Sequence, residues 1–197
     1  MKARQRGVLP LKRDTVRRHP RVWTQRGTAM NPPTDRESVL ARYQEGPLLL
    51  ERALAGLRDG DLDVVPSNGG WTIRQIVHHV ADGDDIWKLC IKQALGNEKA
   101  DFTLAWYWEQ PQTVWADRWA YTDRSVDVSV RLLKANREHV SQLLEQVPDS
   151  WSRSVAIRQR DGGIERVTVG TVVEMQADHV VHHVNRILSI REKARDA

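Results

Sequence analysis

Apolar residues recur every three or four positions in four long segments of the chain, which is the spacing that places them on one face of an α-helix. The four predicted helices are 34–57, 72–95, 125–146 and 168–190. Thr34 with Glu37, and Thr72 with Gln75, have the spacing of a capping box, in which the two side chains bond free backbone N–H groups at a helix start. The first two helices therefore have recognisable beginnings.

The connections between the helices carry residues that break or turn the chain. Gly46-Pro47 predicts a kink or a break in the first helix, because proline removes a helical hydrogen bond. Residues 59–70, rich in Asp, Gly, Pro and Asn, predict a loop. Residues 153–159 and 164–169 predict a β-hairpin around Asp161-Gly162-Gly163. Four long helices and one short hairpin predict an all-α fold, a four-helix bundle with the hairpin before the last helix.

Tryptophan is concentrated in the connection between the second and third helices. Four of the eight tryptophans fall there, in a segment around Pro111 that we expect to be irregular: Trp106, Trp108, Trp115 and Trp119. Aromatic residues at this density can cover the open end of a bundle, line a ligand pocket or form a dimer contact. The sequence leaves these three interpretations open.

Composition narrows the class of protein. A chain of 197 residues with 40% hydrophobic and 28% charged residues is typical of one globular domain. No apolar run approaches the roughly 20 residues that cross a bilayer, so we expect no membrane helix. Cys90 is the only cysteine, which excludes an intramolecular disulfide and fits a reducing compartment. Without a secretory signal pattern, we expect the protein in the cytoplasm.

The formal charge of +4 comes from the N-terminus. Residues 1–29 hold nine Lys and Arg residues against Asp14, a net +8, so the remaining chain carries +4 − 8 = −4. The body of the protein therefore offers no basic surface for nucleic acid, and only the tail could act as a basic arm. We interpret 1–29 as a flexible basic extension and 30–197 as the bundle domain, with Met30 as an alternative start.

Two adjacent histidines in the second helix face different ways. At about 100° per residue, one face is apolar and predicts the core: Ile73, Ile76, Val77, Val80, Trp87 and Ile91. His79 falls on an apolar flank of this face, beside Ile76, Gly83, Ile86 and Cys90. His78 falls on the side of Arg74, Asp82, Asp85 and Lys92, and we expect it to be exposed to solvent.

The fourth helix carries a second histidine pattern. His179 and His183 lie four residues apart on the core-facing stripe, whereas His182 turns to a flank. Each inward histidine can be a hydrogen-bonded core residue, but together with His79 they supply three nitrogen ligands and leave a coordination position open, as in a catalytic zinc site. We expect His19, in the tail, and His139, on a polar face, to stay outside this site.

Cys90 lies too far along the second helix to take part. It follows His79 by about 16 Å along the helix axis, so we interpret it as a small buried hydrophobic residue rather than a nucleophile.

Around these histidines the sequence resembles the DinB/YfiT superfamily of four-helix-bundle metalloproteins. Trp71-Thr72 opens a helix that bears one ligand histidine, His79, within WTIRQIVHHVAD. The last helix bears H-x-x-x-H, here His179 and His183 within HVVHHVNRI. SVDVSVRLLKANREHVSQLLEQV is similar to the third helix of the YfiT branch. The resemblance covers about residues 34–190.

The resemblance implies that His79, His179 and His183 bind one divalent metal ion, zinc or nickel. It also implies a thiol S-transferase that joins a low-molecular-weight thiol, such as bacillithiol or mycothiol, to an electrophilic substrate, in a homodimer. A metal-dependent hydrolase with a metal-bound water and a non-catalytic metal-binding stress protein are the alternatives. For a hydrolase, Asp82 and Gln176 are the nearest polar candidates for a supporting role, although the helical angle puts Asp82 on the solvated flank.

Overall fold

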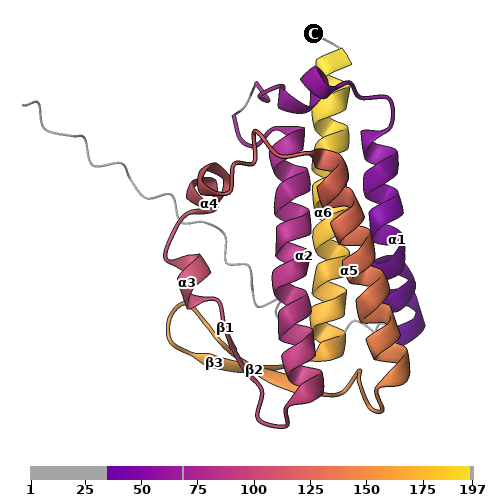
Figure 1. Ribbon diagram of the computed structural model, residues 1–197, viewed down its shortest axis with the longest axis vertical. Helices are drawn as coiled ribbons and strands as arrows, with labels where there is room; N and C mark the ends of the chain where they lie inside the picture. Colours follow the sequence, from indigo (N-terminus) through magenta and orange to yellow (C-terminus); the bar gives the residue numbers. More distant parts are fainter. Residues whose placement is uncertain (1–34, 68, 196–197) are drawn as a thin grey trace, which may run out of the picture. The chain divides into compact units, whose positions relative to one another are not determined.

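Four long helices form the body of the structure, as the hydrophobic pattern predicts (Figure 1). The computed structural model describes residues 35–67 and 69–195, so the predictions for the basic tail, His19, Met30 and the domain boundary lie outside it. The helices are α1 (Arg36–Leu54), α2 (Ile73–Gly96), α5 (Val126–Gln146) and α6 (Val169–Arg195). α1 packs on α6, and α2 packs on both α5 and α6, so α2 and α6 share the core.

Local capping explains where α2 begins. The Gln75 N–H donates to Thr72 Oγ1 at 3.3 Å, and the Thr72 N–H donates to Gln75 Oε1 at 3.0 Å, which is the predicted capping box. α1 differs, because its N-cap is Asp35, which makes no side-chain capping bond. Thr34, the expected cap, lies outside the described residues.

Helix α1 continues through Pro47 instead of breaking there. Proline has no N–H, so the Tyr43 carbonyl one turn earlier loses its helical donor. Arg137 Nη1 of α5 donates to this carbonyl at 2.6 Å. Gly46 makes the approach possible, because a Cβ at this position would overlap Arg137 Nη1. A side chain from another helix therefore satisfies the group that proline leaves unpaired.

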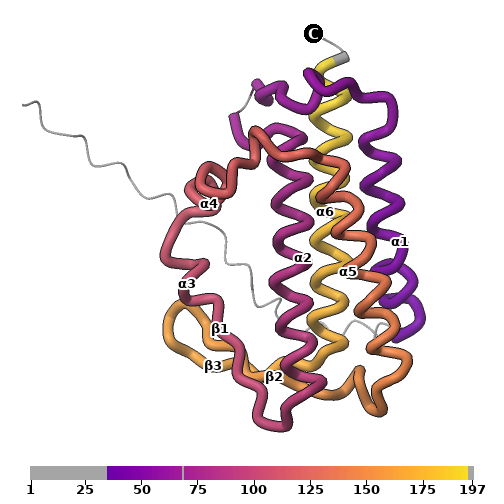
Figure 2. The backbone as a smooth tube through the Cα atoms, in the orientation of Figure 1, coloured from indigo at the N-terminus to yellow at the C-terminus, as the bar shows by residue number. Residues whose placement is uncertain are grey.

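A three-stranded sheet lies beside the lower part of α2 in the view of Figure 2. β2 (Ser154–Arg158) and β3 (Ile164–Thr168) form the predicted antiparallel hairpin. β1 (Asp101–Thr103) pairs with β2 in parallel, and the sequence did not predict it. A three-residue strand is too short to show an alternating pattern, and its partner lies more than fifty residues away.

The connections are more ordered than the sequence suggests. The predicted loop contains a short 3-10 helix, η1 (Asp59–Asp63), and the tryptophan-rich segment contains α3 (Ala105–Trp108) and α4 (Gln112–Arg118). In Figure 1 this segment lies outside the four-helix bundle, on the left of α2. Among the described helices, none combines the length and apolar character needed to cross a membrane.

Candidate metal centre

Three histidine side chains from two helices meet in the core between α2 and α6. His79 Nε2 lies 3.2 Å from His179 Nε2, which lies 3.1 Å from His183 Nε2. His179 and His183 stack because they are one helical turn apart on α6. Among the described residues this is the one group of three or more histidine, cysteine or acidic side chains arranged to hold a metal ion. We call it the three-histidine cluster.

All three imidazoles are held in the neutral form. Burial lowers the pKa of His79, His179 and His183, and the neighbouring imidazoles lower each pKa further. The charge of Arg186 adds to this effect on the pKa of His79 and His183. The neutral imidazole is the form that binds metal ions, because it has a free lone pair.

The hydrogen bonding of the cluster fits a bound cation. Nδ1 of His179 and Nδ1 of His183 are buried, and neither has a hydrogen-bond partner among the described residues. A neutral imidazole carries one proton, and with that proton on Nδ1 the Nε2 lone pairs face one another. Two nitrogens each about 2.1 Å from one ion at tetrahedral angles are about 3.4 Å apart. The observed separations of 3.1 and 3.2 Å are close to this value.

Comparison with known proteins places the chain in a family. The sequence profile of the DinB superfamily matches residues 42–187. The chain belongs to the DinB superfamily. The structure of YfiT from Bacillus subtilis has the same fold, with a TM-score of 0.70 at 22% identity, covering 87% of this chain and 93% of YfiT. Its published description is a probable metal-dependent hydrolase with an unusual four-helix bundle topology.

Two relatives of this DinB protein carry similar names. A "Putative metal-dependent hydrolase" of Geobacillus thermodenitrificans is 26% identical over 160 residues, which are 81% of this chain and 85% of the relative. A "Putative metal-dependent hydrolase" of Bacillus mycoides is 28% identical over 157 residues, 78% of this chain and 84% of the relative. These names describe the relatives as metal-dependent enzymes, and in this DinB protein the three-histidine cluster is arranged to hold a metal ion.

His78 corrects the sequence prediction, because it is fully buried. Its Nδ1 lies 2.8 Å from Ser129 Oγ, and its Nε2 lies 3.1 Å from the Arg124 carbonyl oxygen. That carbonyl can only accept, so Nε2 carries the proton and Nδ1 accepts from the Ser129 hydroxyl. The helical angle correctly placed His78 on the polar flank of α2, but Arg124 and the start of α5 cover this flank. His78 is a hydrogen-bonded core residue in this DinB protein.

Asp82 and Gln176 occupy different environments. Both Asp82 carboxylate oxygens accept from Arg124, at 2.7 and 3.1 Å, and Asp82 is half-buried rather than solvated. Gln176 is buried one turn before His179, and its Oε1 has no hydrogen-bond partner among the described residues. Gln176 therefore remains a polar neighbour of the cluster, whereas Asp82 belongs to an ion pair.

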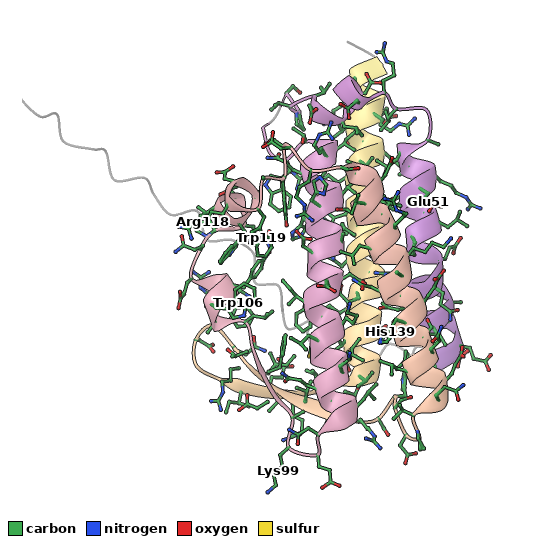
Figure 3. All side chains as sticks on the ribbon, in the orientation of Figure 1. Glu51, Lys99, Trp106, Arg118, Trp119 and His139 are labelled. Carbon is green, nitrogen blue, oxygen red and sulfur yellow. The ribbon has the colours of Figure 1, made fainter. Side chains whose placement is uncertain are left out.

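His182, His139 and Cys90 lie where the sequence placed them. His182 is exposed on α6, and His139 is exposed on α5 (Figure 3). Cys90 is fully buried, and burial raises the pKa of its thiol to about 12. A thiol with this pKa stays protonated near neutral pH and is a poor nucleophile.

The tryptophan-rich segment reaches the cluster through a continuous series of aromatic contacts. In Figure 3, Trp106 and Trp119 lie on the side of the segment that faces α2. Ring centroids are 6.3 Å apart between Trp119 and Tyr121 and 6.4 Å apart between Tyr121 and Trp71. The Trp71 ring in turn packs edge-on against His79 at 4.7 Å. An apolar wall therefore leads from the surface to the histidines.

Sequence reasoning did not single out Tyr121 or Arg186 as neighbours of the cluster. Arg186 follows His183 by three residues, a spacing that places both on adjoining parts of one helix face. That spacing was a usable signal. Tyr121 gave none, because its position depends on how the connection folds back onto α2.

Proposed function

We propose that His79, His179 and His183 bind a divalent ion, zinc or nickel, and that the protein transfers a low-molecular-weight thiol to an electrophilic substrate. The convergence of three buried, neutral Nε2 atoms carries this proposal. A divalent ion at these nitrogens would supply Lewis acidity, which lowers the pKa of a thiol or a water bound beside them. The resemblance to thiol transferases supports the choice of a thiol.

The charges around the cluster also support a thiol over water. The charged groups that shift the pKa of the three histidines are arginines, Arg186 and Arg137, and no carboxylate contributes. Hydrolysis benefits from a general base beside the water. Asp82 pairs with Arg124 as the ionised carboxylate, but this pairing engages both of its oxygens, so it is not free to act as that base in this arrangement. A thiol that binds as the thiolate needs no base at the moment of attack.

The aromatic wall gives the electrophile a place to lie. Trp71 is half-buried against His79, and the buried Tyr121 ring packs behind it. Such rings bind apolar and aromatic groups and exclude water from them. Trp71 would orient the substrate, and the three histidines would hold the ion. This assigns the tryptophan-rich segment to a ligand pocket, one of the three roles that the sequence left open.

Hydrolysis is the second candidate, and the names of the relatives favour it. It predicts turnover of esters or amides without any added thiol. A metal-binding stress protein predicts bound metal with neither activity.

Elemental analysis tests the ligand set first. Wild-type protein should contain about one divalent ion per chain, and His79→Ala and His183→Ala should lose it. His182→Ala is the matched control, because His182 is exposed on the same helix. His78→Ala does not serve as a control, since His78 is buried and hydrogen-bonded. Equal metal content in all four proteins would contradict the assignment.

The reaction is tested on metal-loaded protein. Calorimetric titration with bacillithiol, mycothiol and cysteine should detect binding, and a chloro-dinitrobenzene-type electrophile should be consumed only when a thiol is present. Absence of both thiol binding and turnover rules out the transferase. Thiol-independent cleavage of an ester panel would establish the hydrolase instead. The homodimer implied by the resemblance stays a prediction, which light scattering during gel filtration can test.

A further inference from the structure

Arg186 is a cation beside the three-histidine cluster, and no anionic residue in the described part of the chain pairs with it. It is half-buried on α6, and its charge lowers the pKa of both His79 and His183. Among residues 35–67 and 69–195, no side chain or carbonyl forms a hydrogen bond or an ion pair with it. A half-buried guanidinium without a partner has lost part of its hydration, and no hydrogen bond or ion pair compensates for that loss.

The other arginines in similar surroundings are all paired. The described part of the chain holds five further arginines that are buried or half-buried: Arg42, Arg74, Arg124, Arg137 and Arg191. Each donates to a carboxylate or to a backbone carbonyl. Arg186 alone departs from this pattern, and it does so next to the candidate metal centre.

The backbone beside Arg186 is shaped to admit its guanidinium. Gly70 has a φ of +106°, and a Cβ there would lie 2.5 Å from Arg186 Nη2. Glycine both adopts this left-handed backbone and leaves the space open. Gly70 directly precedes Trp71, whose ring packs on His79. Arg186, Trp71 and the histidines therefore border one site.

We propose that Arg186 binds a carboxylate of the molecule that reacts at the three-histidine cluster, so that the site takes a carboxylate-bearing substrate. The proposal rests on the proposed function, because it requires an ion at the three histidines. Three neutral imidazoles with a divalent ion and a nearby guanidinium make a strongly positive site. An anionic ligand offsets this charge, and the planar guanidinium matches a carboxylate with two parallel hydrogen bonds.

The carboxylate can belong to the thiol or to the electrophile, and paired probes separate these cases. For the thiol, mercaptoacetate is compared with 2-mercaptoacetamide, which has the same size but no charge. For the electrophile, 4-chloro-3-nitrobenzoate is compared with 4-chloro-3-nitrobenzamide. Affinity is measured by calorimetry on metal-loaded wild-type protein, Arg186→Gln and Arg186→Lys. Arg131→Gln is the matched control, because it removes an exposed arginine from α5.

In wild type, the carboxylate probe of one of the two pairs should bind about ten to a hundredfold more tightly than its neutral amide, as expected for a hydrogen-bonded charge pair. Arg186→Gln should abolish this preference, Arg186→Lys should keep part of it, and Arg131→Gln should keep all of it. The metal content should stay the same in every variant, which separates substrate recognition from loss of the metal centre.

The failures are distinguishable. If wild type holds its metal ion but binds the charged and neutral probes of both pairs equally, the carboxylate subsite is wrong and the proposed function stands. The same holds if Arg186→Gln retains the full preference. If wild type holds no metal ion, the proposed function fails, and the carboxylate subsite fails with it.

Discussion

Arg137 and the three-histidine cluster both lie among the same helices, but they differ in how far the protein satisfies their hydrogen-bonding groups. The Arg137 guanidinium donates to Asp84 Oδ1 at 3.1 Å, to the Tyr43 carbonyl at 2.6 Å and to the Gln176 carbonyl at 2.8 Å. It therefore connects α5 to α2, α1 and α6. The three histidines instead have Nε2 atoms that face each other, and the buried Nδ1 atoms of His179 and His183 have no partner among the described residues.

The difference separates a structural polar group from a binding site. Every element that packs around Arg137 supplies an acceptor, so the protein itself satisfies this charge, and removing it should cost stability. The histidine cluster is incomplete within the protein, so its alteration should cost ligand binding more than folding. Five predictions test this contrast, from the largest expected effect to the smallest.

Arg137→Met should lower the free energy of unfolding by about 3–5 kcal/mol, because it leaves the Asp84 carboxylate buried without its partner. Urea unfolding followed by circular dichroism measures the change. Metal content per folded molecule should be retained. Arg131→Met, on the exposed face of the same helix, is the control and should change stability by less than about 0.5 kcal/mol. If the free energy of unfolding changed by a similar amount in the two variants, the structural role of Arg137 would be contradicted.

His183→Ala should show the opposite behaviour. Its metal affinity should fall by more than about a hundredfold, since even the outer partners of metal ligands are worth 10–100-fold. The metal-free protein should lose far less stability than Arg137→Met loses. Competition with a chelating dye measures affinity, and urea unfolding in EDTA measures stability. A large loss of metal-free stability would show that the cluster is needed for folding.

Gly46→Ala should destabilise the protein by about 1–3 kcal/mol, because the added methyl group overlaps the Arg137 guanidinium. In an unobstructed helix the same change is stabilising by about 1 kcal/mol. Gly96, at the end of α2, has open space where a Cβ would lie, so Gly96→Ala is the control. Thermal unfolding of both variants gives the comparison, and equal melting temperatures would disprove the close approach.

His78→Ala should lower the free energy of unfolding by about 1–2 kcal/mol, because it removes the partner of the buried Ser129 hydroxyl and leaves the Arg124 carbonyl with only the longer bond from Arg74, at 3.4 Å. Metal content should not change. His182→Ala, which removes an exposed histidine, should stay within about 0.5 kcal/mol of wild type. If His78→Ala lost its metal at temperatures where the protein is folded, His78 would have to be reassigned as part of the metal centre.

The metal-free protein should lose stability as the pH falls below about 6.5. Burial lowers the pKa of the three cluster histidines in the native state, so the unfolded chain takes up protons first and is favoured by acid. Burial raises the pKa of Asp84 to about 6, which acts in the opposite direction between about pH 6 and 4. The three histidines together have a larger effect on the free energy of unfolding than the single aspartate, so the net effect of acid is a loss of stability.

His183→Ala sharpens this pH test. Removal of one such histidine should reduce the slope of stability against pH by up to about 1.4 kcal/mol per pH unit. Urea unfolding at pH 7, 6 and 5 in the presence of a chelator measures both slopes. Parallel slopes for wild type and variant would show that His183 is not held neutral in the native state.

Much of the candidate site was predictable because it depends on local geometry. Thr72 and Gln75 start α2 through a bond between neighbours in the chain, and helical periodicity then sets the direction of His79. His179 and His183 share a face because they are four residues apart. These relations hold within one helix, whatever packs around it.

Tertiary structure decided the features that depend on contacts between distant segments. His78 is buried because residues 124 and 129 lie over its flank, and periodicity in α2 contains no information about that covering. β1 exists because residue 101 meets residue 156. Arg186 lies beside the cluster because the loop at Gly70 leaves it room, and no described residue pairs with it. The amino-acid sequence by itself determined which side chains each helix presents, whereas packing determined which of them found a partner, because hydrogen bonds and desolvation depend on what lies opposite.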